Sequence, residues 1–169
     1  MLKKFFREYV TAENIFLLCI VSTISLLGFA FVLEYFVDLV PCPLCIVQRF
    51  FFFFIGLTAL GGLLCKNLFT VRRSGVLVAL LALLGGSIAL RQIILQHQPM
   101  DMESTGCAVS FGSFFDSFLY ALGGRGNCGV VDWTFLTLSI AEWSLLCFVG
   151  FLVVGVGLVI GIGKHEDKI

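Results

Sequence analysis

Charged residues are scarce in this chain. Lysine, arginine, aspartate and glutamate make up 13% of its 169 residues, and hydrophobic types make up 59%, whereas soluble domains carry about 25% charged and about 45–50% apolar residues. Eleven basic and eleven acidic side chains leave no net charge, and there is no basic stripe of the kind that binds nucleic acid. The composition therefore argues against a soluble or nucleic-acid-binding domain and indicates a protein whose solvent is lipid.

Several sequence motifs are also missing. The chain has no glycine-rich dinucleotide fingerprint, and its C-x-x-C sequence, Cys42 to Cys45, is followed by Ile46 instead of the histidine that haem attachment needs. No A-x-A-like cleavage site follows the first apolar run, so we expect this run to remain in the mature protein.

Four long apolar runs are present. A helix needs about 20 mainly apolar residues to cross a membrane, and the sequence predicts spans at about 15–33, 46–65, 75–95 and 143–163. The connections 34–45 and 96–142 would then lie on the same side. The predicted fold is an all-α membrane protein, a four-transmembrane-helix bundle that forms a single integral domain over residues 1–169.

The basic residues are unevenly distributed among the connecting segments. Three lysines and arginines precede the first span, three lie between the second and third, and two follow the fourth, which makes eight of eleven. By the positive-inside rule both termini are cytoplasmic, and the connections 34–45 and 96–142 face outward. Trp133 and Trp143 are then suitably placed to anchor the outer interface.

Four of the seven cysteines fall in the two outer connections, in pairs, namely Cys42, Cys45, Cys107 and Cys128. Disulfides can persist in this location because it is outside the reducing cytoplasm. The other three lie in spans or at a cytoplasmic helix end, and we expect them to be small packing residues.

The first cysteine pair coincides with a predicted helix start. Pro43 suits the first position of a helix, and a residue before proline favours extended backbone, so Cys42 would cap a helix that begins at Pro43. Cys45 then lies in the first turn, where the positive end of the helix dipole favours the thiolate that reacts in disulfide exchange. Gln48 and Arg49 lie on the same helix face, three and four residues later. Alone, C-x-x-C also fits an inert disulfide or half of a metal site.

The longer connection holds a predicted amphipathic helix between Cys107 and Cys128, which Ser110 can cap and Gly123 can end. We expect this helix to lie on the outer membrane surface, or to pack against the bundle, and in either place to hold the second cysteine pair near the first. His97, just after the third span, is a candidate proton carrier, and the alternative is a solvated residue in a polar turn.

Two outer cysteine pairs suggest a thiol exchange chain, for which a quinone dissolved in the lipid would be a suitable electron acceptor. Three features of the sequence together resemble the disulfide bond formation protein B (DsbB) family over essentially the whole chain. They are Cys42-x-x-Cys45-x-x-Gln48-Arg49 at the start of the second span, the second pair in the long connection, and Trp133 followed by Phe135-Leu136 after Cys128.

The resemblance implies an enzyme of the bacterial inner membrane that reoxidises a periplasmic DsbA-like thiol oxidase and reduces ubiquinone or menaquinone. It implies that Cys107 forms the mixed disulfide with that oxidase, that Cys128 exchanges with Cys42, and that Cys45 meets the quinone. Arg49 would support quinone binding. Gln48 and His97 are further candidates for the quinone site, and no metal is expected.

Two alternatives use the same observations. A quinone reductase of the vitamin K epoxide reductase type also combines four spans with C-x-x-C, but the motif of that family falls late in the bundle, whereas here it opens the second span. A non-enzymatic tetraspan protein could hold two structural disulfides or a four-thiolate zinc site, although zinc would favour a second closely spaced pair.

Overall fold

The structure, a computed structural model, describes residues 11–36, 42–65, 70–97 and 133–162. Its helices are α2 (Ala12–Phe36), α3 (Pro43–Leu64), α4 (Val71–His97) and α6 (Ile140–Gly157), and a short π-helix, η3 (Leu158–Ile162), continues α6. Each of the four is long and apolar enough to cross a membrane. The predicted membrane fold of four helices is therefore confirmed, while the predicted amphipathic helix lies outside the described residues.

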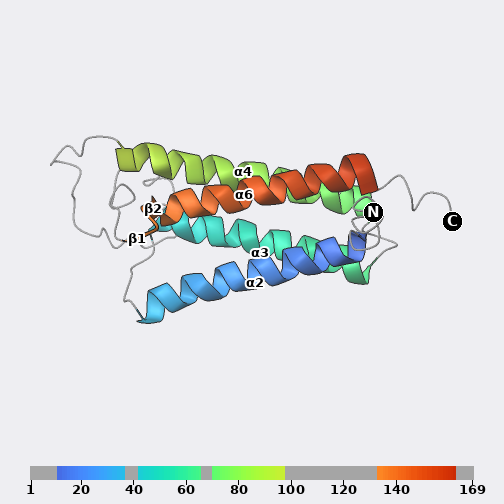
Figure 1. The fold of residues 1–169 in the computed structure, drawn as a ribbon, viewed down its shortest axis with the longest axis horizontal. Helices are drawn as coiled ribbons and strands as arrows, with labels where there is room; N and C mark the ends of the chain where they lie inside the picture. The colour runs from blue at the N-terminus through green and yellow to red at the C-terminus, as the bar shows by residue number, and fades with distance from the viewer. Residues whose placement is uncertain (1–10, 37–41, 66–69, 98–132, 163–169) are drawn as a thin grey trace, which may run out of the picture.

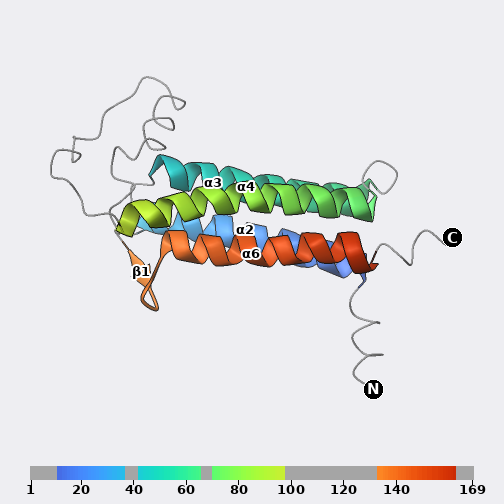
Figure 2. The same cartoon turned by 90° about the horizontal axis from the view of Figure 1, so that it is seen from above.

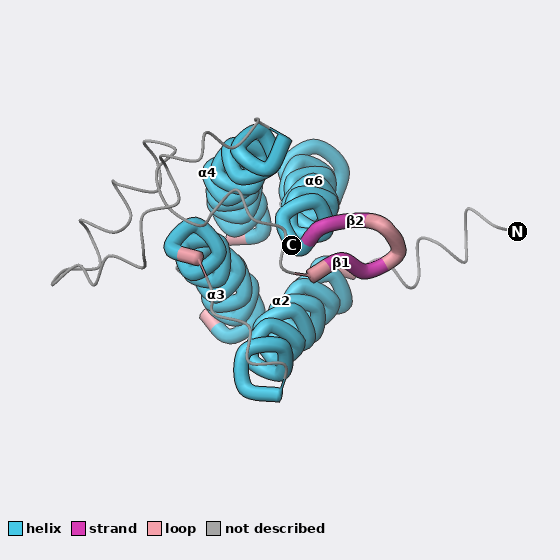
Figure 3. Tube along the Cα trace, turned by 90° about the vertical axis from the view of Figure 1, so that its left-hand side faces the viewer, coloured by secondary structure: helices cyan, strands magenta, loops and turns pink. Residues whose placement is uncertain are grey.

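The four helices lie side by side along the long axis of the molecule and alternate in direction (Figures 1 and 2). Seen along this axis, they follow one another around the bundle in chain order (Figure 3). α4 packs against both α3 and α6, and α3 packs against α2. The start of α3 therefore lies at the same end of the bundle as the last turns of α2 and α4. We call this the cysteine end, because Cys42 and Cys45 lie there.

The side chains are mostly turned away from the bundle interior. Between 17% and 33% of the residues in the four spans are buried, and the exposed ones include many large apolar types. Water would disfavour such a surface, whereas lipid tails are as apolar as these side chains. The distribution agrees with a bundle surrounded by lipid.

Small residues let α4 and α6 approach closely. A Cβ atom added at Gly155 would lie 2.8 Å from the backbone oxygen of Gly75 and 2.8 Å from the backbone nitrogen of Ala79. Nearer the middle of the bundle, the rings of Phe52 and Phe148 stack with their centroids 4.1 Å apart. The core is thus built by backbone contact at one level and by aromatic stacking at another.

The helix ends differ from the predicted spans. α2 continues to Phe36, so Glu34 is a helical residue and does not belong to the connection predicted to start there. α4 likewise includes His97. Glu34 can remain in the last turns of α2 because its carboxylate pairs with Arg49 of α3, which offsets part of the cost of placing a charge near lipid.

A small hairpin precedes α6, which the sequence did not predict. Strands β1 (Thr134–Phe135) and β2 (Leu138–Ser139) pair in antiparallel fashion around Leu136 and Thr137, whose φ angles are 51° and 68°. Two successive positive φ values are typical of a type I′ turn, which usually uses asparagine and glycine. The indole nitrogen of Trp143 donates a hydrogen bond of 3.0 Å to the Phe135 carbonyl oxygen. The hairpin is thereby attached to the first turn of α6.

Candidate functional site

Cys42 and Cys45 meet at the first turn of α3, as predicted. Cys42 is the N-cap, with extended backbone angles, and its sulfur accepts a hydrogen bond of 3.4 Å from the Cys45 backbone nitrogen. The Sγ atoms of the two residues are 3.0 Å apart, with the Cys42 thiol donating to the Cys45 sulfur. A disulfide bond is about 2.05 Å long, so closing it requires the two sulfurs to approach by only about 1 Å. The pair can therefore interconvert between dithiol and disulfide with little movement.

Gln92 of α4 is a member of this site that the sequence reasoning missed. Its side-chain nitrogen Nε2 lies 3.2 Å from Cys45 Sγ and 3.5 Å from Cys42 Sγ. The residue is 4% exposed, and a buried amide is stable only when its polar atoms have partners. A polar residue within the third apolar run was the available signal, but nothing local indicated which helix it would face.

Gln48 completes the contact between α3 and α4. Its Nε2 atom donates a hydrogen bond of 2.8 Å to Oε1 of Gln92, and its side chain is 2% exposed. The predicted helix face was therefore right, because Gln48 does point to the region of Cys45. Its described contact is with Gln92, which in turn contacts both sulfurs.

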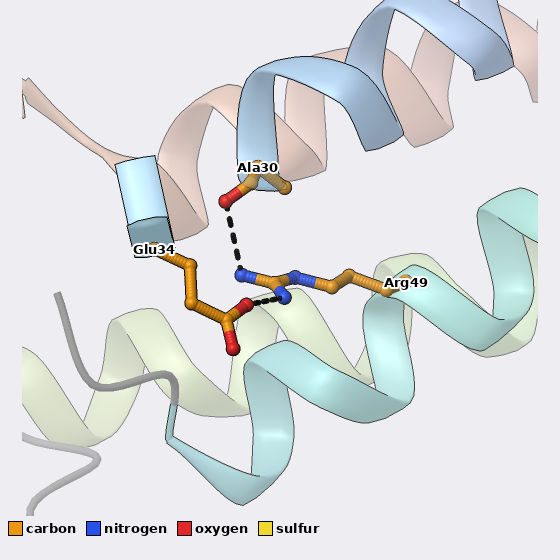
Figure 4. Close-up of polar contacts among 3 residues, drawn as sticks. All are labelled: Ala30, Glu34 and Arg49. Carbon is orange, nitrogen blue, oxygen red and sulfur yellow. Dashed lines mark hydrogen bonds and ion pairs between the residues drawn. The ribbon is translucent and has the colours of Figure 1, made fainter. Parts of the chain in front are cut away.

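Arg49 reaches across to α2. Its guanidinium group forms an ion pair with the Glu34 carboxylate and donates a hydrogen bond of 3.4 Å to the Ala30 carbonyl oxygen (Figure 4). It also lies over the Phe31 ring, 5.6 Å from the centroid. The Arg49 side chain is 22% exposed and that of Glu34 is 29% exposed. The sequence placed a cation at this level of the helix, but it did not identify the carboxylate that pairs with it.

His97 lies at the end of α4 and is exposed. Its Nδ1 atom is 2.9 Å from the Ile93 carbonyl oxygen of the same helix, which is a contact within the last turn. Among the described contacts, none joins His97 to the two sulfurs. The exposed position agrees with the solvated alternative, and a role of His97 as proton carrier or in the quinone site stays a prediction.

The remaining cysteines are dispersed. Cys19 is buried in α2, Cys147 is half-buried in α6, and Cys65 caps the far end of α3. The positions of Cys19 and Cys147 agree with packing roles, whereas Cys65 is exposed. Cys107 and Cys128 lie outside the described residues, so the predicted second pair stays a prediction.

Comparison with known proteins covers nearly all of the described chain. The family model for disulfide bond formation protein DsbB matches residues 12–158. Disulfide bond formation protein B 1 of Pseudomonas aeruginosa is 43% identical over 147 residues, which cover 83% of this chain and 90% of that protein. Disulfide bond formation protein B of a Polaromonas species is 34% identical over 169 residues, which cover 95% of this chain and 99% of that protein.

Proposed function

This chain belongs to the DsbB family of disulfide bond formation proteins, and on that premise we propose that it oxidises a periplasmic DsbA-type thiol oxidase and delivers the electrons to a membrane quinone. The observation that carries the proposal is the pair of Cys42 and Cys45 sulfurs, 3.0 Å apart at a helix start. Family membership favours this over a vitamin K epoxide reductase or an inert tetraspan protein.

The proposed transfer uses both cysteine pairs in sequence. A thiolate of the partner attacks the Cys107–Cys128 disulfide and forms a mixed disulfide with Cys107, and the second partner thiol then resolves it. The partner leaves as a disulfide, having given up two electrons and two protons. Cys128 then attacks Cys42 and forms a disulfide with it, which breaks the Cys42–Cys45 bond and releases Cys45 as a thiolate that hydrogen bonds from neighbouring donors stabilise. Cys107 attacks Cys128 in turn, which restores the Cys107–Cys128 disulfide and leaves Cys42 as a thiol.

The residues around Arg49 fit a quinone headgroup. When bound, a quinone accepts two electrons and two protons and becomes a quinol. Arg49 has five N–H donors, more than its contacts with Glu34 and Ala30 use, and it can donate to a ring carbonyl oxygen. The exposed Phe31 ring supplies apolar surface beside it. Cys45 supplies the sulfur through which the electrons leave the protein.

The proposed location is the bacterial inner membrane, with the cysteine end facing the periplasm and both termini in the cytoplasm. Arg72 and Arg73 at the start of α4, at the opposite end from the cysteines, support this orientation. Ubiquinone and menaquinone are both compatible acceptors.

The function can be tested with purified protein in detergent. We expect it to oxidise a reduced DsbA-type protein while consuming one equivalent of added ubiquinone analogue or menaquinone analogue, followed by absorbance. Failure of the partner to lose its thiols with either quinone would contradict the proposal. Zinc bound stoichiometrically to the four outer cysteines would favour the structural alternative, because thiolates that hold zinc cannot act as a disulfide relay.

Replacing Arg49 with alanine is expected to raise the apparent KM for quinone by roughly tenfold or more, because a hydrogen bond from a charged donor contributes about 1.5–3 kcal/mol. The kcat should change much less, since Arg49 has no described hydrogen bond to the reacting sulfurs. Steady-state kinetics with varied quinone would measure both values. Arg72→Ala, which removes an exposed arginine from the far end of the bundle, is the matched control. An unchanged KM in Arg49→Ala would remove this residue from the quinone site.

A further inference from the structure

Two buried glutamines form the polar contact between α3 and α4 beside the cysteine pair. Gln48 is 2% exposed and Gln92 is 4% exposed, and the adjacent buried residues Leu44 and Leu95 are apolar. A buried amide is stable only when its polar atoms have partners, and an amide pair alone can join two membrane helices. Here, however, the partners of Gln92 include the two sulfurs as well as Gln48.

The hydrogen bond between the two glutamines fixes which end of the Gln92 amide faces the sulfurs. Nε2 of Gln48 donates to Oε1 of Gln92 at 2.8 Å, so the carbonyl end of Gln92 is occupied on the Gln48 side. The NH₂ end of Gln92 is then the nearer one to the sulfurs, 3.2 Å from Cys45 Sγ and 3.5 Å from Cys42 Sγ. The Gln92 Oε1 atom lies farther away, 3.6 Å from Cys45 Sγ, and it can accept a hydrogen bond from that sulfur only while Cys45 is a thiol. This group has two hydrogens, and both sulfurs are within its reach.

The donor discriminates between the oxidation states of the pair. A thiolate accepts hydrogen bonds much more strongly than a neutral sulfur, because the acceptor is charged. Reduction of the disulfide creates such a thiolate at Cys45, in the first turn of α3, where the helix dipole also favours negative charge. Gln92 therefore stabilises the reduced pair more than the disulfide. A pair whose reduced form is stabilised is a stronger oxidant.

We propose that Gln92 is a catalytic hydrogen-bond donor that raises the reduction potential of the Cys42–Cys45 pair, and that Gln48 is the positioning residue that keeps the Gln92 NH₂ group turned toward the sulfurs. The inference rests on the proposed function only in taking this pair to be redox-active. It explains how a half-buried pair that packs beside apolar side chains can accept electrons that originate from a strongly oxidising partner.

The test measures the potential of the first pair alone. In the full chain carrying Cys107→Ser and Cys128→Ser, the Cys42–Cys45 disulfide is equilibrated with glutathione, so that two glutathione molecules form one glutathione disulfide as the disulfide becomes a dithiol. Gln92→Leu is expected to shift this equilibrium toward the protein disulfide by about tenfold or more, which corresponds to a fall in potential of about 30 mV or more. Gln48→Leu should shift it in the same direction by a smaller factor.

A double variant separates this role from packing. Gln48→Leu combined with Gln92→Leu leaves no unpaired amide in the helix contact, so folding should be kept. Its equilibrium constant should equal that of Gln92→Leu alone, because Gln48 acts only through Gln92. Equilibrium constants within twofold of the parent, in Gln92→Leu and in the double variant, would overturn the proposal.

The matched control is Gln96→Leu on the same helix. Gln96 also joins α4 to another helix, since its Oε1 atom accepts a hydrogen bond of 3.0 Å from the Ser139 hydroxyl group, but it has no described contact with either sulfur. The reduction potential of the Cys42–Cys45 pair in Gln96→Leu should equal that of the parent. A fall as large as that in Gln92→Leu would show a general loosening of the bundle and overturn the inference. If the parent formed no Cys42–Cys45 disulfide in any buffer, the proposed function itself would fail instead.

Discussion

Cys45→Ser is expected to abolish quinone reduction by a reduced DsbA-type partner, with a loss of roughly a thousandfold or more, as is seen when an enzyme loses its nucleophile. The serine hydroxyl group cannot form a disulfide with Cys42, so the pair has no oxidised form to regenerate. It also cannot supply the thiolate beside Gln92. Initial rates of quinone loss, with partner and quinone both saturating, would measure the effect.

The control for this prediction lies on the same helix. Cys65→Ser changes the same atom at the far, exposed end of α3, and its rate should be close to that of the parent. Full quinone reduction by Cys45→Ser would show that electrons leave through another group. The Cys42–Cys45 pair would then have to be assigned a structural role.

Gly155→Leu is expected to give a large loss of stability. The first atom of any side chain at this position would lie 2.8 Å from backbone atoms of Gly75 and Ala79. Backbone atoms cannot rotate away as a side chain can, so α4 and α6 must separate and lose the packing around the contact. Overpacking a core costs about 1–3 kcal/mol of stability and occasionally more. Because the clash here is with backbone atoms, we expect a loss of about 3 kcal/mol or more. Thermal unfolding in detergent, followed by circular dichroism, would show a lowered midpoint.

Gly150→Leu is the matched control for that substitution. Gly150 lies on the same helix, and a Cβ added there would meet nothing within 4 Å, so the leucine side chain can extend outward. Its unfolding midpoint should remain near that of the parent. Equal midpoints for the two variants would contradict close packing of α4 on α6 at Gly155.

Several features of the fold follow from local sequence alone. The four spans could be predicted because apolar runs of about 20 residues are a composition signal that does not depend on what the runs touch. The start of α3 at Pro43 could be predicted because proline at a first helical position and an extended residue before it are local backbone constraints. The same constraints placed Cys45 in the first turn, with Gln48 and Arg49 on its face.

The hairpin before α6 was missed because its turn uses Leu136 and Thr137. Neither residue is common at positive φ, and the usual sequence signal of such a turn is asparagine followed by glycine. The turn is held instead by strand pairing and by Trp143, which donates to the Phe135 carbonyl oxygen eight residues earlier. These contacts override the preferences of the turn residues.

The sequence by itself determined the four-helix membrane fold, the family, and the position of Cys42 and Cys45 at a helix start, because each depends on neighbouring residues or on motif spacing. Only the tertiary structure decided what surrounds the sulfurs. Gln92 reaches them from a position 47 residues after Cys45, and Glu34 pairs with Arg49 from the preceding helix. The rotation of one helix against another sets such contacts, and this rotation depends on packing over whole helix faces, which no short stretch of sequence encodes.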